Sequence, residues 1–334
     1  MAKESLRVGV VGLGKMGLIH ASVLNVLPNV ELAVLCEKSG LTRRFFKKVF
    51  EVPIVEDVLK FADMGLDAVY VTTPIPSHFF VAKTVYEERI ARHLFVEKTL
   101  ASNYDESKKL CELASVSGGV NMVGYLRRFA VTFMKAKELL SEGAVGDVVS
   151  FEAHAYSSDF YGVGEGLGTS AARGGVLKDL GCHVLDLALW LFGDFQVNIQ
   201  ELQQSLDSSS GDSLRFRVRN APRGFEGEFD ISWCVEGYRF PEVGIAVKGS
   251  KGIVEVNDDK VALRSDDDDS FSWYRHDLND SVAFWLGWPE YYRENECFVK
   301  SVRENRVVEP NFGSSAKVDS VIEQALQGFG DSGK

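Results

Sequence analysis

Short apolar runs rich in β-branched residues alternate with helical patterns along the first 124 residues. The runs predict strands at residues 6–11, 32–36, 68–72, 93–96 and 120–123, with helices between them. Strands that alternate with helices form a parallel sheet covered on both faces. Residues 1–124 are therefore expected to form a doubly wound α/β domain with its ligand outside the carboxyl ends of the strands.

Beyond a connecting helix predicted near residues 130–142, the apolar pattern changes to a period of two. It predicts strands at 148–156, 214–218, 225–233, 244–247, 252–256 and 261–263, and helices at 175–192, 290–304 and 314–327. Closely spaced strands joined by glycine or acidic turns are typical of a mostly antiparallel sheet. Residues 125–334 are expected to be an α+β domain whose open sheet carries helices on one face. The run Asp266–Asp269 is interpreted as a solvated turn rather than a metal site.

Length and composition fit this two-domain picture. The chain has 334 residues, about twice a typical domain, and 45% hydrophobic and 25% charged residues, which suits a folded protein. Its net charge of −11 argues against broad binding to nucleic acids or anionic membranes, because their phosphates would be repelled.

The cysteines and the N-terminus favour a reducing compartment. The five cysteines are scattered and never spaced C-x-x-C, so free thiols are expected. The chain starts without the apolar region of a signal peptide, and no apolar run is long enough to cross a bilayer. We expect a cytoplasmic protein.

The strongest local motif follows the first predicted strand. Gly12, Gly14 and Gly17 form G-x-G-x-x-G, with Lys15 and Met16 between the last two glycines. The first glycine permits a tight turn, the second lets the main chain approach a pyrophosphate, and the third lets the helix pack on the strand. A strand before the motif and a helix, strand and acid after it make a dinucleotide site the expected function of these residues.

The acid is Glu37, which lies 20 residues after Gly17. A carboxylate at this offset binds the ribose hydroxyls of an adenosine, which favours NAD. Lys38, Arg43 and Arg44 lie close enough in sequence to leave NADP open.

Two positions are candidates for proton transfer. Asp179 and His183 are spaced i and i+4, which places both on one face of a predicted helix, and an imidazole titrates near neutral pH. Lys98 directly follows a predicted strand, where the nicotinamide end of the cofactor is expected. A helix pair with a half-buried histidine and a lysine in a surface loop are the structural alternatives. No metal is expected, because the remaining histidines show no matching ligand spacing.

Together these motifs resemble the Gfo/Idh/MocA family (glucose-fructose oxidoreductase, inositol dehydrogenase and MocA) over nearly the whole chain. The matching stretches are the glycine motif, Thr72 to His78, Glu97-Lys98, Gly124 to Phe129, and Gly174 to His183. The resemblance implies an N-terminal Rossmann domain and a C-terminal α+β domain. It also implies NAD(P)-dependent hydride transfer on a sugar, cyclitol or related polyol.

The resemblance also assigns residues. It implies catalytic roles for Lys98, Asp179 and His183, with the histidine as proton acceptor. Further cofactor contacts are expected from Thr73, Pro74, His78 and Glu97, and substrate contacts from Arg127, Arg128, Tyr156 and Tyr161. Phe160 and the glycine-rich segment 157–173 are expected either to cover the substrate or to form a surface loop. Homodimers or homotetramers through the C-terminal sheet are expected.

The chain departs from the family pattern after Lys98. Many members continue E-K with proline, often in cis, whereas this chain has Thr99. A cis peptide before threonine costs about 3–4 kcal/mol, so the sequence leaves the conformation of this loop open.

The sequence also leaves the chemistry partly open. The leading hypothesis is an NAD(P)-dependent dehydrogenase or reductase acting on a sugar, cyclitol or nucleotide-sugar. Two alternatives are an NAD-dependent glycoside hydrolase that oxidises its sugar transiently, and a non-catalytic dinucleotide-binding protein. The substrate, the direction of the reaction and the oligomer size cannot be derived from the sequence.

Overall fold

The computed structural model describes residues 5–159, 161, 174–204, 213–220, 222–266, 269–282 and 288–332. The chain divides into two compact units, one of residues 1–126 with 282–319 and one of residues 127–281 with 320–334. The sequence predicted a single boundary after residue 124. In the structure, residues 282–319 belong to the first unit, because helix α8 (Pro289–Glu304) packs against helix α1 (Lys15–Val26).

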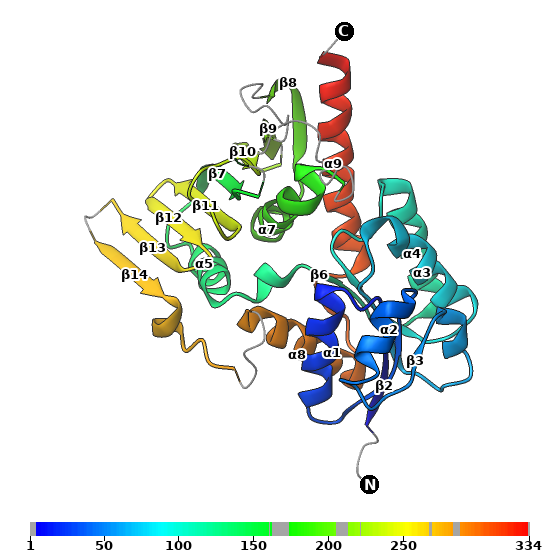
Figure 1. The fold of residues 1–334 in the computed structure, drawn as a ribbon. Helices are drawn as coiled ribbons and strands as arrows, with labels where there is room; N and C mark the ends of the chain where they lie inside the picture. The colour runs from blue at the N-terminus through cyan, green and yellow to red at the C-terminus, as the bar shows by residue number, and fades with distance from the viewer. Residues whose placement is uncertain are drawn as a thin grey trace. The chain divides into compact units, whose positions relative to one another are not determined.

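The described part of the first unit contains a six-stranded parallel sheet in the order β3-β2-β1-β4-β5-β6 (Figure 1). Its strands are β1 (Leu6–Val11), β2 (Val30–Cys36), β3 (Ile54–Val55), β4 (Ala68–Val71), β5 (His93–Glu97) and β6 (Asn121–Gly124). The strand order reverses between β1 and β4, which is the position where doubly wound sheets bind their ligands. The predicted fold class of this half is confirmed.

Helices follow most of these strands. They are α1, α2 (Gly40–Phe46), the 3-10 turn η1 (Val58–Phe61), α3 (Ile75–Glu87) and α4 (Tyr104–Ser117), with α8 and the start of α9 (Phe312–Ser332) joining later in the chain. Helix α1 packs on β1 and β2, whereas α3 packs on β4 and β5. Right-handed crossovers that run in opposite directions from the centre place these helices on opposite faces of the sheet.

The described part of the second unit contains an eight-stranded sheet in the order β14-β13-β12-β11-β7-β10-β9-β8. Its strands are β7 (Val148–Tyr156), β8 (Gln196–Gln204), β9 (Ser213–Asn220), β10 (Phe225–Ser232), β11 (Glu242–Gly249), β12 (Gly252–Asn257), β13 (Lys260–Ser265) and β14 (Ser270–Tyr274). Every pair in the sheet is antiparallel except the parallel pair of β7 with β10. The predicted mostly antiparallel sheet is confirmed.

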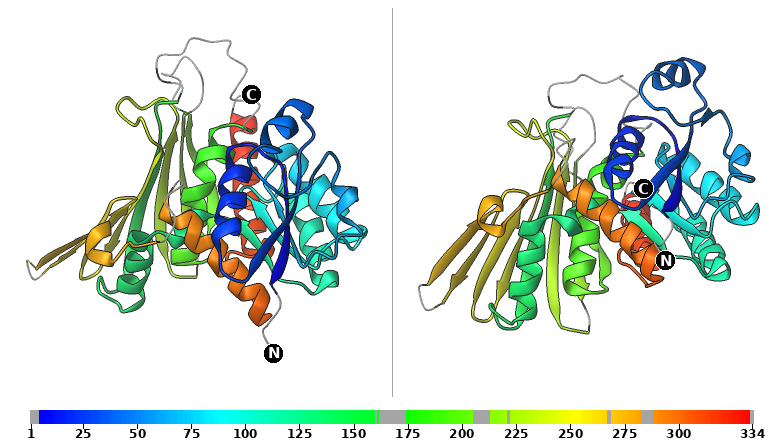
Figure 2. Two further views of the ribbon diagram at one scale, coloured as in Figure 1. Left: turned by 60° about the horizontal axis from the view of Figure 1, so that its bottom comes forward. Right: turned by 90° about the horizontal axis from the view of Figure 1, so that it is seen from below.

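Helices pack on one face of this sheet, as Figure 2 shows. The second unit also contains the turn η2 (Leu126–Phe129), α5 (Val131–Ser141), the π-helical turn η3 (Leu177–Gly181), α7 (Cys182–Phe192) and the turn η4 (Arg275–Leu278). Helix α5 packs on β12 and β13, and α7 packs on β7 and β11. Phe151, Phe192, Phe225 and Phe229 form an aromatic core between α7 and the sheet.

Three strands and one helix differ from the prediction. Strand β3 has two residues and β8 is rich in polar residues, so neither carries a clear apolar period. Strand β14 is a short run of five residues, SFSWY, that was not predicted. The helix expected over 175–192 begins as the π-helical turn η3 and becomes α-helical only at Cys182. Asp266 and Asp269 are exposed between β13 and β14, as expected, whereas Asp267 and Asp268 lie outside the described residues.

Candidate active site

The turn between β1 and α1 has a shape that requires glycine at two positions. Gly12 has a φ of +95°, and a Cβ atom there would lie 2.8 Å from Thr73 Cγ2. A Cβ atom on Gly17 would lie 1.8 Å from the Gly12 carbonyl oxygen, so α1 packs directly on the loop. A side chain at either position would therefore change the path of the loop.

The middle glycine leaves space. A Cβ atom on Gly14 would meet no atom within 4 Å, and Gly14 caps α1 without a side-chain hydrogen bond. The first turn, with Lys15 and Met16, contains no acidic residue. The N-terminus of α1 is thus an open, partly positive cradle, and its backbone N–H groups suit the pyrophosphate of a dinucleotide.

Glu37 follows β2 and lies next to this loop. Its Oε2 accepts a hydrogen bond of 2.9 Å from the Leu13 N–H, and its Oε1 accepts one of 2.8 Å from the Ser39 N–H. Arg43 donates to the carbonyl oxygens of Glu37 and Lys38, at 2.7 and 2.6 Å. The carboxylate is therefore held beside the glycine loop, while Arg43 supports the main chain.

Thr73 and Pro74 follow β4 at the same edge of the sheet. The side-chain oxygen of Thr73 is buried and has no hydrogen-bond partner among the described residues. Pro74 is the N-cap of α3. A buried hydroxyl without a partner beside the glycine loop fits a ligand that supplies one. Together with the cradle at Gly14, this observation shows that the residues present suit a dinucleotide.

His78 connects two loops of the site. Its imidazole is buried, with Nδ1 2.8 Å from the Thr99 carbonyl oxygen and Nε2 2.6 Å from the Thr73 carbonyl oxygen. Burial lowers the pKa of His78, and these two carbonyl contacts oppose that shift. The expected cofactor contact of His78 is thus replaced by contacts to the main chain on both sides.

The loop after β5 contains Lys98. The carboxylate of Glu97 is buried, and its Oε2 accepts a hydrogen bond of 3.1 Å from the Lys98 N–H. The peptide between Lys98 and Thr99 is cis. The Thr99 hydroxyl donates to the Ala101 carbonyl oxygen at 3.3 Å. The main chain around Lys98 is therefore held by Glu97 before it and by His78 after it.

Asp179 and His183 lie in the second unit, on η3 and at the start of α7. Positive φ angles at Gly174 and Gly175 precede the turn. A Cβ atom on Gly181 would lie 2.8 Å from Ile231 Cδ1, so the absence of a side chain lets η3 approach β10. The imidazole of His183 is largely buried, whereas Asp179 is half-buried. π-Helical turns of this kind occur frequently at functional sites.

Arg127 and Arg128 form internal ion pairs. Arg127 donates to Asp258 through Nε and Nη2, at 3.0 and 3.3 Å. Arg128 forms a bidentate pair with Asp186 of α7, at 2.8 and 2.6 Å, and both partners are buried. The resemblance to the family implied substrate contacts for these arginines. In the structure, they attach η2 to the sheet and to α7 of the second unit.

The two predicted substrate tyrosines lie away from α7. Tyr156 lies on the face of β7 opposite Ala155 and the aromatic core, where its ring stacks on His154 at 4.8 Å. Because side chains alternate along a strand, β7 directs Tyr156 away from the face that carries α7. Tyr161 is exposed and donates to Glu236 at 2.9 Å. Phe160 and residues 162–173, expected near the substrate, lie outside the described residues.

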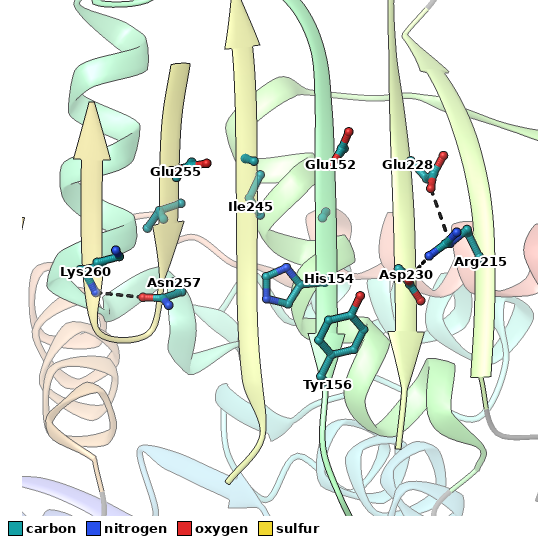
Figure 3. A pocket seen from close by; sticks show the side chains of 13 residues that line it. Glu152, His154, Tyr156, Arg215, Glu228, Asp230, Ile245, Glu255, Asn257 and Lys260 are labelled. Carbon is teal, nitrogen blue, oxygen red and sulfur yellow. Dashed lines mark hydrogen bonds and ion pairs between the residues drawn. The ribbon is translucent and has the colours of Figure 1, made fainter. Parts of the chain in front are cut away.

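The open face around Tyr156 is hollowed. A pocket of about 390 Å³ lies on this face. Figure 3 shows His154 and Tyr156 from β7 beside Asp230 from β10. Arg215 of β9 forms an ion pair with Asp230. Burial raises the pKa of Tyr156, and the nearby Asp230 raises it further. Charged side chains on neighbouring strands thus compensate one another across this face.

The structure gathers the predicted cofactor residues at the carboxyl edge of β1, β2, β4 and β5. Sequence reasoning missed His20 and Asn295, which form a buried network with Glu97. His20 follows Gly17 by three residues, but nothing in the sequence connects it with Asn295. In the part of the chain that the structure describes, no cluster of His, Cys, Asp or Glu side chains is arranged to hold a metal ion. None of the described helices has the length and apolarity needed to cross a membrane.

Comparisons with known proteins identify similar sequences and structures. A family model described as "Oxidoreductase family, NAD-binding Rossmann fold" matches residues 6–125, and one described as "GFO/IDH/MocA C-terminal domain" matches residues 133–255. Among solved structures, a levoglucosan dehydrogenase in complex with NADH and levoglucosan has a TM-score of 0.82. It is 22% identical, and the match covers 97% of this chain and 98% of that chain.

Two curated relatives illustrate the sequence similarity. The uncharacterized oxidoreductase YdgJ of Escherichia coli is 29% identical over 215 residues, covering 62% of this chain and 60% of that protein. The match thus spans about three fifths of the length of this relative. Myo-inositol 2-dehydrogenase of Thermotoga maritima is 24% identical over 317 residues, covering 89% of this chain and 88% of that protein.

Proposed function

This chain belongs to the Gfo/Idh/MocA family of oxidoreductases, and from that premise we propose that it transfers a hydride between NAD and a hydroxyl or keto carbon of a sugar or cyclitol. The observation that carries the proposal is the cradle at Gly14 with the Glu37 carboxylate fixed beside it. A site of this kind binds the adenosine and pyrophosphate of a dinucleotide at the carboxyl edge of the sheet. Lys98 and Thr73 follow strands at that same edge.

The cofactor preference follows from Glu37. Its carboxylate would accept hydrogen bonds from ribose hydroxyls, whereas a 2′-phosphate would meet a negative charge. Arg43 donates to main-chain carbonyl oxygens. Lys38 and Arg44 are exposed and are the remaining basic residues near this position. We therefore assign NAD as the cofactor.

We assign the chemistry to Lys98, Asp179 and His183. In the oxidation direction, the C–H bond of the alcohol would break with its electron pair, and NAD, which the Gly14 cradle and Glu37 would hold, would supply the hydride acceptor. The hydroxyl proton passes to the His183 imidazole, which leaves a ketone. Lys98 donates a hydrogen bond to the reacting oxygen, and Asp179 orients the imidazole. Arg127 and Arg128 have no part in this proposal, because their guanidinium groups are engaged by Asp258 and Asp186.

The substrate class is proposed from the relatives. Myo-inositol and levoglucosan, which appear in the names of two similar proteins, are both cyclic polyols or sugars. We propose a cyclic polyol or sugar derivative, including nucleotide-sugars, as the substrate. We also propose a cytoplasmic location, in line with five cysteines that are all free thiols.

We further propose that the protein is a homodimer or homotetramer that associates through the open face of the eight-stranded sheet. α5 and α7 pack on the other face, so this broad surface carries no helix among those described. Its charged rows on β9 and β10 are paired, which lowers the cost of burying them against a second copy.

Replacement of His183 by alanine tests the assignment. We expect His183→Ala to abolish hydride transfer while NADH affinity stays within about twofold, since only the proton acceptor is removed. NADH formation is measured by absorbance over a panel of sugars, cyclitols and nucleotide-sugars, and NADH binding by calorimetry. Turnover of the variant at the parental rate would show that His183 is not the base. A wild-type protein without turnover on the whole panel would contradict the proposed reaction.

A further inference from the structure

His20 is buried inside the first unit, and both of its ring nitrogens contact polar side chains. Nε2 lies 2.8 Å from Oε1 of Glu97, and Nδ1 lies 3.0 Å from Oδ1 of Asn295. The rings of Tyr70 and Phe95 pack on the imidazole, with centroid distances of 5.6 and 5.0 Å. Since His20 has no exposed surface, its hydrogen bonds must be satisfied by these two neighbours.

The amide of Asn295 fixes one proton of His20. The Nδ2 atom of Asn295 donates to the Tyr291 carbonyl oxygen at 2.6 Å. With the amide turned over, two oxygens would lie at that distance and repel each other, so Oδ1 must face His20. An amide oxygen only accepts, and therefore Nδ1 of His20 carries a proton.

The short contact to Glu97 then requires a second proton. A bare Nε2 and a bare carboxylate oxygen are both acceptors and would repel each other at 2.8 Å. One proton must lie between them, either as an imidazolium facing a carboxylate or as a neutral imidazole facing a carboxylic acid. In both forms the pair carries no net charge, which suits a site with little access to water.

Glu97 connects this pair to Lys98. The second oxygen of Glu97, Oε2, accepts the Lys98 N–H at 3.1 Å. His20 thus sets the orientation of the Glu97 carboxyl group. The carboxyl group in turn holds the main chain of Lys98 in position. Gly124 on β6 leaves room for this carboxyl group, because a Cβ atom there would lie 3.1 Å from Oε2.

The remaining titratable groups near His20 come from β4 and α8. Burial raises the pKa of Tyr70 well above its usual range, and the charge of Glu294 on α8 raises it further. Tyr70 is therefore neutral, and its side-chain oxygen has no hydrogen-bond partner among the described residues. Glu294 is itself buried.

We propose that His20 and Glu97 share one proton and that His20 is a positioning residue, which holds Lys98 in place through the Glu97 carboxyl group. The part of this inference that concerns catalysis rests on the proposed function of Lys98. The shared proton does not, because it follows from contacts within the first unit alone.

The shared proton is tested on the protein without substrate. The protein contains six histidines, and uniform ¹⁵N labelling of histidine resolves the ring nitrogens of each by NMR. His20 is assigned by the signals lost in His20→Gln. We expect Nδ1 to be protonated and Nε2 to be protonated or to share its proton. A bare Nε2 would overturn the inference whether or not the enzyme turns over.

The positioning role is tested by a single variant and a double variant of the pair. His20→Gln leaves the buried Glu97 carboxylate without the proton of the pair, and we expect kcat to fall roughly tenfold or more because Lys98 is displaced. The double variant His20→Gln with Glu97→Gln removes the negative charge and keeps an acceptor for the Lys98 N–H. We expect its kcat to exceed that of the single variant about threefold or more.

The controls separate positioning from folding. Glu296→Gln changes the exposed neighbour of Asn295 on α8 and should leave kcat within about twofold. Asn295→Ala, which keeps both members of the pair, should give an intermediate loss with an unchanged dissociation constant for NADH. A double variant no more active than His20→Gln would overturn the positioning role. An inactive wild-type protein would count against the proposed function and leave the NMR result to decide the shared proton.

Discussion

At the scale of single residues, the carboxylate of Glu37 sets the expected choice between NAD and NADP. Glu37→Gln keeps the shape of the side chain and an acceptor for the Leu13 N–H, but it removes the charge. Hydrogen bonds to charged groups exceed neutral ones by about 1 kcal/mol, so we expect the dissociation constant of NADH to rise about fivefold. The preference for NADH over NADPH should narrow as well. Calorimetric titration with both cofactors measures the two effects.

Glu31→Gln is the matched control for this prediction. Glu31 lies near the start of the same strand, β2, where it pairs with Arg7 away from the glycine loop. Its replacement should leave both dissociation constants within about twofold. Equal changes in the dissociation constants of the two variants would indicate that the net charge of the protein, rather than the position of Glu37, determines cofactor affinity.

His93 makes stability depend on pH. The Val120 N–H donates to its Nδ1 at 2.8 Å, so Nδ1 must stay unprotonated, and burial followed by the charge of Arg92 lowers the pKa of His93. Because the folded pKa lies below the unfolded value of about 6.5, this contribution is complete above pH 6.5 and is lost as the pH falls through the folded pKa. The lost hydrogen bond is worth about 1 kcal/mol, or roughly 2–4 °C in Tm.

We therefore expect His93→Gln to have a Tm below that of the wild type by this amount at pH 8, and the gap to narrow as the pH falls below 6.5. Thermal unfolding of both proteins across this range measures the difference. His276→Gln serves as control, because the His276 side chain is 80% exposed and its replacement should change Tm little. If the Tm difference between the wild type and His93→Gln widened as the pH fell, the pKa of His93 would be shifted in the opposite direction.

At the scale of elements, two glycines in the turn from β1 to α1 are expected to have different roles: Gly17 in the stability of the fold and Gly14 in NADH binding. Gly17→Ala would place a Cβ atom 1.8 Å from a backbone oxygen, and we expect it to destabilise the protein by about 1–3 kcal/mol. Gly14→Ala meets no atom within 4 Å and has an allowed φ of −71°, so its Tm should change little. Its NADH affinity should fall about tenfold or more, since the methyl group fills the cradle. Urea unfolding and calorimetry distinguish the two variants, and a Gly14→Ala protein with parental affinity would contradict the proposed cradle.

Helices and strands were predictable where apolar residues recur with a regular period along the sequence. The strands at 6–11 and 148–156 have the predicted bounds, because their apolar positions are continuous or alternate strictly. Strand β8 was missed, since residues 196–204 are mostly polar and are stabilised by pairing within the sheet. The π-helical turn at 177–181 was also beyond prediction, because it depends on the packing of Gly181 against Ile231.

At the scale of the whole molecule, the parts of the site that were predictable are those that follow strands. Glu37 and Lys98 each come directly after a parallel strand, and Thr73 lies two residues after one, so topology alone gathers these residues at one edge. Contacts between distant segments gave no signal. The network of His20 and Asn295 spans 275 residues, and Arg128 meets Asp186 across 58 residues. Arg128 was expected to contact the substrate, whereas in the structure it binds Asp186 and supports α7. Residue type and spacing alone do not distinguish these two roles.

Association through the open sheet face is tested by Ala246→Arg on β11. Ala246 lies between Glu152 and Glu255 on the neighbouring strands, so an arginine there gains opposite charges within one copy. A long charged side chain at the centre of this face would prevent the close approach of a second copy. We expect the variant to be monomeric by light scattering after size-exclusion chromatography, with a parental far-UV spectrum. Ser141→Arg adds the same side chain at the exposed end of α5, which packs on the opposite face, and should leave the parental mass unchanged. An Ala246→Arg protein of parental oligomeric mass would exclude this face as the interface.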